Sequence, residues 1–463
     1  MKQVLALSAV QQARLIREGE ISSEELIKAH LERIAEVNPA INAAVEVLAE
    51  RAMSEARSAP PGELHGVPFS IKDSIQLGGS VSTAGTLGRA KAAPASEDAT
   101  VVARLRRAGA IPIARTNVPD LLFAFESDNL IFGATSNPYD LSRTSGGSSG
   151  GEAALIADCG SPVGLGSDAA GSVRLPAAFC GIAGIKPTSG RLPRTGHFPP
   201  AGGWIEALWQ IGPMARRVED LTAVMPLLVG SDGVDPTAVG MPWLDPLDVS
   251  LRDLRVAFYT DNEIAATNAN VAQVIRAAAH ALMDVVLAVD EARPAGVENA
   301  YDLEMKLLGA DGGDGLWQYL AAQGSTAAHP LLRGWLEKLE PYRTDLAGFQ
   351  KYWDEWDRYR ASMLEIFGRY DVILCPAYTE VALPHGTSTL DANFRGFSHT
   401  MAYNLAGWPA AVVRCGESAS GLPIAVQVVA PPWREDVALA VAAALEEAFG
   451  GWKAAGPRNE MRR

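Results

Sequence analysis

The sequence predicts an α/β fold organised around a parallel β-sheet. An apolar run from Gly66 to Ile75 is typical of a strand that ends at Lys72, a helical segment follows near 97–107, and a second apolar run covers 110–114. Strand, helix and strand in this order form a βαβ unit, whose strands run parallel in one sheet. The C-terminal part repeats the alternation, with a strand predicted at 423–429 and a helix at 437–449.

A helix is predicted near the N-terminus. Ser22 and Glu25 form a capping box, and apolar side chains then recur at helical spacing from Leu26 to Ile34. His30 lies within this stripe, where we expect a hydrogen-bonded histidine on a helix face rather than a ligand or a base.

A second helix is predicted late in the chain. Its aromatic and apolar residues recur at helical spacing and are Phe349, Trp353, Trp356, Met363 and Phe367. A short buried strand is predicted at 371–375, where Pro376 stops it. The aromatic stripe predicts core packing rather than a cofactor site.

The 463 residues contain no linker at which to divide them, so one domain spanning 1–463 is expected. The 48% share of hydrophobic residues predicts a large core, and the formal charge of −14 disfavours nucleic acid as a partner. No segment offers the roughly 20 apolar residues of a membrane span, and no signal peptide is recognisable. We therefore expect a cytoplasmic protein.

Cysteine and histidine spacing predicts no metal site and no cofactor. The seven histidines are scattered without a His-Glu-x-x-His element, and the four cysteines are far apart: Cys159, Cys180, Cys375 and Cys415.

Two glycine-rich turns carry the chemistry that the sequence suggests. One, at 146–151, contains Ser148, and the other, at 166–174, contains Ser172. Small residues let the backbone approach a substrate and direct several N–H groups at one point, as an oxyanion requires. A serine nucleophile with its own oxyanion hole is therefore the leading hypothesis.

Two short motifs in this region suggest other folds. Residues 146–150 match the G-x-S-x-G nucleophile elbow, but the elbow needs a strand directly before it, and residues 137–144 are polar and turn-forming. Residues 164–169 match a G-x-G-x-x-A dinucleotide pattern, which is weak alone, and no Walker lysine follows.

The spacing of these segments resembles the amidase signature family. The similar segments cover nearly the whole chain and are 66–73, 132–138, the two serine turns, 179–188, 212–216, 404–409 and 421–427. The resemblance is strongest to the branch of fatty acid amide hydrolases, bacterial aryl acylamidases and urethanases. It implies a large mixed, mostly parallel β-sheet covered by helices on both faces, with core motifs in 66–216 and 370–450.

The resemblance also implies a Ser-cisSer-Lys triad. Ser172 would be the nucleophile, Lys72 the base and Ser148 the bridge between them, with a cis peptide bond before Ser148. A buried lysine suits this role because desolvation lowers its pKa. The plain alternative for Lys72 is a pair with Asp73, and Lys186 is a rival base, although its place before Pro187 predicts a strand end.

The resemblance places the oxyanion hole at the backbone N–H groups of Ala169, Ala170, Gly171 and Ser172. Ser149 and Asp168 would hold the turns, and Arg174 would pair with a carboxylate. Three residues depart from the family pattern, which are Ala134, Ser145 and Ala170. The methyl group of Ala170 stands where many members have glycine, so it affects the expected substrate size.

The substrate side is expected in the more variable region 192–345. The segments 192–209 and 307–335 are rich in Gly, Pro and aromatic residues, including Phe198, Trp204, Trp209, Trp317 and Tyr319. They predict an apolar pocket for a hydrophobic or aryl amide, or a carbamate. We expect the protein to be a monomer or a homodimer. The alternatives are a glutaminase subunit of an amidotransferase and a non-catalytic binding module.

Overall fold

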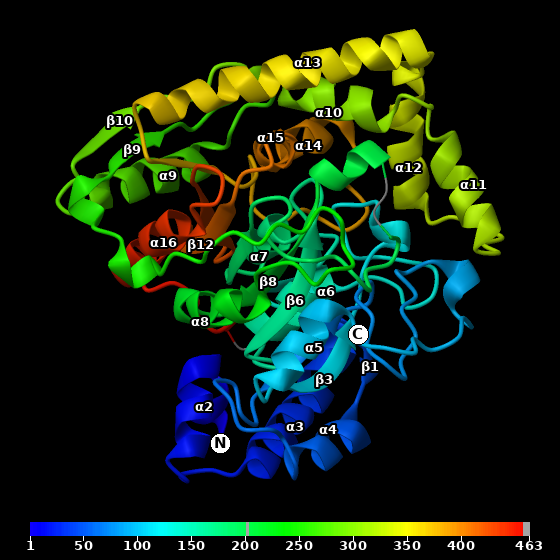
Figure 1. The fold of residues 1–463 in the computed structure, drawn as a ribbon, viewed down its shortest axis with the longest axis vertical. Helices are drawn as coiled ribbons and strands as arrows, with labels where there is room; N and C mark the ends of the chain where they lie inside the picture. The colour runs from blue at the N-terminus through cyan, green and yellow to red at the C-terminus, as the bar shows by residue number, and fades with distance from the viewer. Residues whose placement is uncertain (201–202, 457–463) are drawn as a thin grey trace.

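The computed structural model describes residues 1–200 and 203–456, and a large mixed sheet forms its centre (Figure 1). Eleven strands of the described residues belong to this sheet. In order across it they are β1 (Ala44–Val47), β3 (Ile111–Thr116), β2 (Pro68–Lys72), β6 (Val163–Asp168), β8 (Gln210–Ala215), β7 (Ala183–Lys186), β12 (Ala410–Glu417), β13 (Pro423–Val429), β11 (Val372–Pro376), β9 (Arg255–Phe258) and β10 (Ala288–Glu291).

The expected large mixed sheet is confirmed, and so is the parallel pairing of β2 with β3. Parallel pairs lie toward the two ends, where β2 also pairs with β6, and β9 pairs with β11 and β10. The middle, from β6 to β11, is antiparallel, as is the β1–β3 pair. The expectation of a mostly parallel sheet is therefore wrong for the described residues, where most strand pairs are antiparallel. The reason is that short connections, such as 418–422 between β12 and β13, can only join antiparallel strands in a hairpin.

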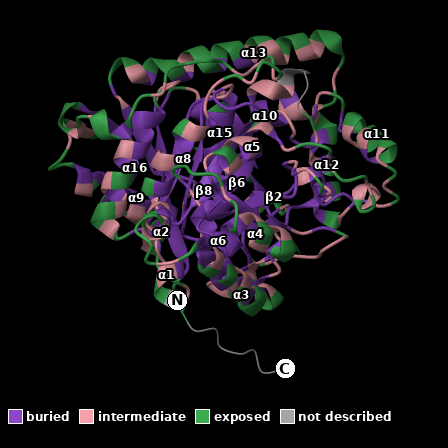
Figure 2. Ribbon diagram, turned by 60° about the horizontal axis from the view of Figure 1, so that its bottom comes forward, coloured by how far each residue is buried: buried purple, intermediate pink, exposed green. Residues whose placement is uncertain are grey.

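Helices cover both faces of the sheet, as expected. One layer comprises α5 (Thr100–Arg107), α8 (Val218–Leu228), α9 (Ala269–Leu282) and α16 (Glu435–Phe449). The other face carries α6 (Gly150–Ala157) and α7 (Arg174–Phe179), with α3 (Ser23–Ile41) against α6. The centre is accordingly buried (Figure 2).

The remaining helices lie around these layers. The N-terminal part of the chain forms α1 (Lys2–Leu5), α2 (Ala9–Arg17) and α4 (Ala49–Ala56). Helices α2 and α4 are labelled at the bottom of Figure 1. At the top and right are α10 (Ala300–Leu308), α11 (Asp314–Ala322), α12 (Pro330–Leu339), α13 (Leu346–Leu364), α14 (Asp391–Phe394) and α15 (Ser398–Leu405). Helix α13 confirms the predicted aromatic helix, and its Trp356 and Met363 are buried.

The N-terminal expectations are also confirmed. Helix α3 begins after Ser22, which forms the capping box with Glu25. His30 is buried, with Nδ1 3.1 Å from the Cys159 carbonyl oxygen and Nε2 3.2 Å from Gln12 Oε1.

The expectation that residues 137–144 contain no strand is wrong. They contribute to a two-stranded antiparallel sheet of β4 (Ser136–Asn137) and β5 (Asp140–Thr144), separate from the main sheet. Its residues can be polar because this hairpin is only partly buried.

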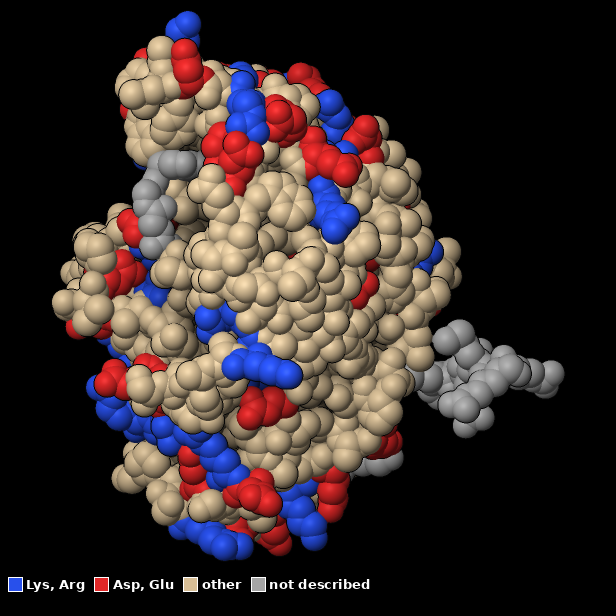
Figure 3. All heavy atoms as spheres, turned by 90° about the vertical axis from the view of Figure 1, so that its right-hand side faces the viewer, with Lys and Arg blue, Asp and Glu red and all other residues tan. Residues whose placement is uncertain are grey.

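None of the helices in the described residues is long and apolar enough to cross a bilayer. On the face shown in Figure 3, basic side chains are interspersed with acidic ones.

Candidate active site

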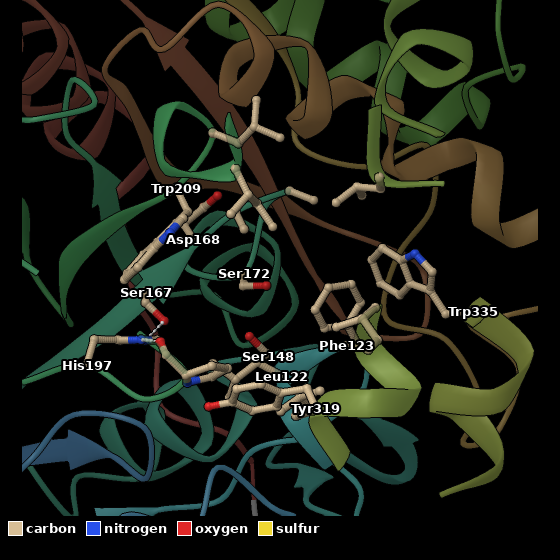
Figure 4. A pocket seen from close by; sticks show the side chains of 18 of the residues that line it. Leu122, Phe123, Ser148, Ser167, Asp168, Ser172, His197, Trp209, Tyr319 and Trp335 are labelled. Atoms are coloured by element: carbon tan, nitrogen blue, oxygen red, sulfur yellow. Dashed lines mark hydrogen bonds between the residues drawn. The ribbon is translucent and has the colours of Figure 1, made fainter. Parts of the chain in front are cut away.

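Three sequence-predicted residues meet at one edge of the sheet. Lys72 ends β2 and the Ser172 turn follows β6, and these neighbouring strands are parallel, so their carboxyl ends lie together. Ser148 precedes α6, and the peptide bond between Gly147 and Ser148 is cis. Ser148 and Ser172 line the same pocket (Figure 4).

The amino group of Lys72 is fully buried among oxygen atoms. Its Nζ lies 2.7 Å from Ser148 Oγ, 3.0 Å from Ser167 Oγ and 3.1 Å from the Ser167 carbonyl oxygen. Burial lowers the Lys72 pKa to about 7, although Asp168 and Glu152 act in the opposite direction. Lys72 does not pair with Asp73, whose carboxylate instead binds Arg115 at 2.9 Å.

Ser167 and His197 form a chain of hydrogen bonds with the Lys72 amine. The Nδ1 of His197 lies 3.0 Å from the Pro199 carbonyl oxygen, so this nitrogen carries the proton and Nε2 is an acceptor. Nε2 lies 3.0 Å from Ser167 Oγ, which leaves that hydroxyl free to accept from Lys72 (Figure 4). A neutral amine that donates to both oxygens of Ser167 directs its lone pair toward Ser148. Sequence reasoning missed both residues, and His197 carries no local signal.

Sequence reasoning also missed Glu152, in the first turn of α6, whose charge acts on the pKa of Lys72. It is fully buried and accepts hydrogen bonds from Ser70 and, at 2.7 Å, from Thr116. Burial raises the Glu152 pKa to about 7. A lone acid in the apolar stretch 150–157 was the signal that could have identified it.

The Ser172 turn is organised by Asp168. Its carboxylate accepts the N–H of Gly171 at 2.8 Å and that of Val173 at 3.1 Å. The expectation that Gly171 contributes to an oxyanion hole is therefore corrected, because its single N–H proton is already engaged. The N–H groups of Ala169, Ala170 and Ser172 have no hydrogen-bond partner among the described residues.

Arg174 pairs with Asp168, as expected for a buried arginine. Its Nε and Nη2 each donate to the carboxylate at 2.9 Å. Burial acts to raise the Asp168 pKa, but Arg174 outweighs it and holds that pKa well below its ordinary value. Ser149 supports the same region, because its N–H donates to the Ser172 carbonyl oxygen at 3.1 Å and its Oγ lies 3.3 Å from the Ser167 carbonyl oxygen.

Two rival interpretations fail on geometry. Lys186 ends β7, as predicted, and its Nζ donates to the Pro187 carbonyl oxygen at 2.9 Å rather than facing a serine. The strand required by a nucleophile elbow is present as β5, but in the described structure Ser148 Oγ contacts Lys72 and no histidine.

The pocket above the two serines has a volume of about 340 Å³ and mostly apolar walls. Its apolar side chains include Leu121, Leu122, Phe123, Ile205, Leu208, Trp209, Leu308, Leu316, Tyr319 and Trp335. Of the predicted aromatic residues, Trp209 and Tyr319 line it (Figure 4).

Phe198 and Trp317 are not among the described residues that line this pocket. The Phe198 ring packs 6.0 Å from that of Tyr319, and Trp317 is 43% exposed. The Trp204 side chain is outside the described part of the structure.

Comparisons with known proteins identify the family of this chain. A family model described as Amidase matches residues 25–439. Fatty-acid amide hydrolase 1 of Sus scrofa is 33% identical, over 94% of this chain and 84% of the relative. One subunit of the glutamyl-tRNA(Gln) amidotransferase of Thermus thermophilus is 34% identical, over 94% of this chain and 96% of that relative.

Among solved structures, 6-aminohexanoate cyclic dimer hydrolase complexed with substrate has a TM-score of 0.87 at 29% identity, covering 96% of this chain and 97% of that chain. The chain belongs to the amidase family, within the amidase signature enzymes, and is a hydrolase that acts on amide C–N bonds.

Proposed function

We propose that the enzyme hydrolyses hydrophobic or aryl amides, and carbamates of similar shape, through Ser172, Ser148 and Lys72. The observation that carries this proposal is the 2.7 Å contact between Lys72 Nζ and Ser148 Oγ beside a pocket that Ser172 also lines. A lysine with a pKa of about 7 is partly neutral at neutral pH and can accept a proton.

In the proposed cycle, Ser172 Oγ attacks the carbonyl carbon while its proton passes to Ser148 and the Ser148 proton passes to Lys72. The N–H groups of Ala169, Ala170 and Ser172 donate to the oxyanion. The C–N bond then breaks, and the leaving amine receives a proton from Lys72 through Ser148. Water repeats the sequence on the acyl-enzyme and releases the acid. From a carbamate, the same cleavage of the C–N bond releases a carbonic acid monoester, which loses carbon dioxide and leaves the alcohol.

The walls of the pocket support this substrate class. Leucine and aromatic side chains dominate the lining, which favours alkyl or aryl groups. The names of two relatives, fatty-acid amide hydrolase 1 and 6-aminohexanoate cyclic dimer hydrolase, agree with amides that carry alkyl chains.

The test is release of 4-nitroaniline from short-chain 4-nitroanilides by the wild type and by Ser172→Ala. We expect release by the wild type and a loss of at least about 10⁴-fold in kcat for the variant, whose folding is checked by thermal melting. Matched aryl carbamates then test the second substrate class. Absence of release from every anilide and carbamate would contradict the proposal.

A second candidate is a glutaminase subunit, which the 34% identity to the amidotransferase chain of Thermus thermophilus favours. Free glutamine carries an ammonium and a carboxylate group, and the mostly apolar pocket suits these charges poorly. Ammonia release from glutamine, without nitroanilide hydrolysis, would select this candidate. Labelling by a fluorophosphonate that Ser172→Ala abolishes would identify a reactive serine in either case.

A further inference from the structure

A buried carboxyl group lies in the wall of the apolar pocket. Glu304 belongs to α10 and is 1% exposed, and both Glu304 and Leu308, one helical turn later, line the pocket. The other buried residues of α10 are all apolar apart from the ring hydroxyl of Tyr301. Glu304 therefore brings a strongly polar group to a pocket whose lining is mostly apolar.

This carboxyl group has no hydrogen bond or ion pair with any described residue, and its Oε2 is fully buried. The other buried acids near the site are satisfied: Asp168 binds Arg174, and Glu152 binds Ser70 and Thr116. An unpaired buried polar group is costly, so its position on a ligand pocket points to a partner supplied by the ligand.

Burial favours the neutral form of Glu304. It raises the Glu304 pKa well above the ordinary value, and it outweighs the opposing charge of Arg174, which is paired with Asp168. The charge of Asp168 acts in the same direction as burial and is the smaller of the two charge effects. The hydroxyl of Tyr359, on α13, donates its proton to the Ala402 carbonyl oxygen at 3.2 Å rather than to this carboxyl group. A neutral carboxylic acid offers one O–H donor and an acceptor oxygen.

We propose that Glu304 binds a second, neutral hydrogen-bonding group of the substrate, such as another amide, a carbamate or a hydroxyl, away from the bond that is hydrolysed. This inference rests on the proposed function and narrows its substrate class to amides with polar groups at both ends of an apolar spacer. A cationic group fits less well, because the only other carboxylate among the described lining residues, that of Asp168, is already paired.

The test compares matched substrates in two series, since either side of the substrate can reach Glu304. One series consists of 4-nitroanilides with a 5-carbamoylpentanoyl, a 6-methylheptanoyl or a 6-aminohexanoyl group, so that an amide, its apolar isostere and a cation are compared. The other consists of acetanilides with a 4-carbamoyl or a 4-isopropyl group. The quantity measured is the ratio of kcat/KM for the polar substrate to that for its apolar partner.

In the wild type we expect the carbamoyl member to be preferred in one series. Glu304→Leu should lower that ratio about tenfold, the effect of one lost hydrogen bond, and Glu304→Gln should largely retain it. Asp302→Asn, at an exposed position of the same helix, is the matched control and should leave the ratio unchanged. Glu304→Leu should also melt at a higher temperature than the wild type, because it removes an unpaired polar group from the interior.

Calorimetric binding of the same compounds to Ser172→Ala, with and without Glu304→Leu, measures the contact without turnover. It therefore separates failure of this inference from failure of the proposed function. Weaker binding of the carbamoyl compound alone supports the inference. Two results would overturn it. One is that the ratios and the affinities are equal with and without Glu304 in both series. The other is a preference for the 6-aminohexanoyl compound that Glu304→Leu removes.

Discussion

At the scale of single residues, Lys72 sets the expected pH dependence of the reaction. In the proposed cycle only its neutral amine accepts the serine proton, so kcat/KM should rise with pH through the lowered pKa of about 7 and then level off. The groups that face it are Asp168, Glu152 and, through Ser167, the imidazole of His197. Measurement of kcat/KM on an uncharged anilide from about pH 5 to pH 10 checks this profile.

Lys186 provides a matched control for that profile. It is equally buried, and burial lowers its pKa to about 7 as well, but its Nζ contacts only the Pro187 carbonyl oxygen among the described groups within hydrogen-bond distance. Lys72→Met should therefore abolish turnover. Lys186→Met should retain activity, and the pH profile of its kcat/KM should have the same midpoint as that of the wild type. A flat profile for the wild type would remove Lys72 from the role of base.

His197 is the second residue whose effect can be predicted singly. Burial lowers its pKa to about 3, so it remains a neutral acceptor for the Ser167 hydroxyl. In His197→Leu that hydroxyl can turn toward the Lys72 lone pair and compete with Ser148, which should lower kcat about tenfold, the value of one hydrogen bond. Steady-state kinetics on a nitroanilide measures this, with Ser74→Ala as the milder control because Ser74 contacts His197 but not Lys72. Wild-type kcat in His197→Leu would exclude the orienting role.

At the scale of elements, local patterns in the sequence predicted the segments that local forces determine. The capping box located the start of α3, and the apolar runs located β2, β3 and β13. The antiparallel middle of the sheet was not predictable, because strand order depends on contacts between distant segments. For the same reason motifs in the sequence single out Lys72, Ser148 and Ser172 as candidates, but not Ser167 and His197, whose contacts arise only when the chain folds.

The turn between β6 and α7 carries the next prediction. Gly171 has a φ of +124°, a region that residues with a side chain rarely adopt, and a Cβ there would lie 2.3 Å from Thr400 Oγ1. The Thr400 hydroxyl in turn lies 2.7 Å from the Ala170 carbonyl oxygen. Gly171→Ala should therefore displace the oxyanion donors and lower kcat by about 10²-fold or more.

Ala170 gives the contrasting substitution in the same turn. Its methyl group lies in the pocket wall and its φ is not positive. Ala170→Gly should accordingly retain turnover and change the preference between short and bulky acyl groups. Kinetics on an acyl series for both variants measures the difference, and complete inactivity of a folded Ala170→Gly would contradict this account.

At the scale of the whole molecule, one buried polar network joins distant segments of the chain through the site. Arg174, on α7, donates to Asp168 at the end of β6, to Asn404 on α15 and, at 2.6 Å, to Gln427 on β13. Segments more than 200 positions apart in sequence are thereby fixed against the Ser172 turn. Stability and the geometry of the turn therefore depend on the same carboxylate.

Removing that carboxylate charge should destabilise the protein strongly. Asp168→Asn leaves the Arg174 guanidinium buried without a counter-charge, at a cost of about 3–5 kcal/mol in the free energy of unfolding, which denaturant titration measures. A double variant, Asp168→Asn with Arg174→Leu, should be less destabilised than the sum of the single variants, because it leaves no uncompensated charge. Additive effects would show that the pair is not energetically coupled.

The same network predicts how stability depends on pH. The Asp168 pKa in the folded protein is depressed below the value of about 3.9 of an unfolded aspartate, so the folded state binds fewer protons in that range. The contribution of the Asp168–Arg174 pair to the free energy of unfolding is therefore fully present above about pH 4. It is lost as the pH falls through the depressed pKa of Asp168 in the folded protein. Asp168→Asn should lack this part of the acid destabilisation, so the difference in unfolding free energy between it and the wild type should narrow as the pH is lowered below about 4. A difference that stays constant over this range would show that the folded and unfolded states bind the same number of protons at this group, so that the network does not depress its pKa.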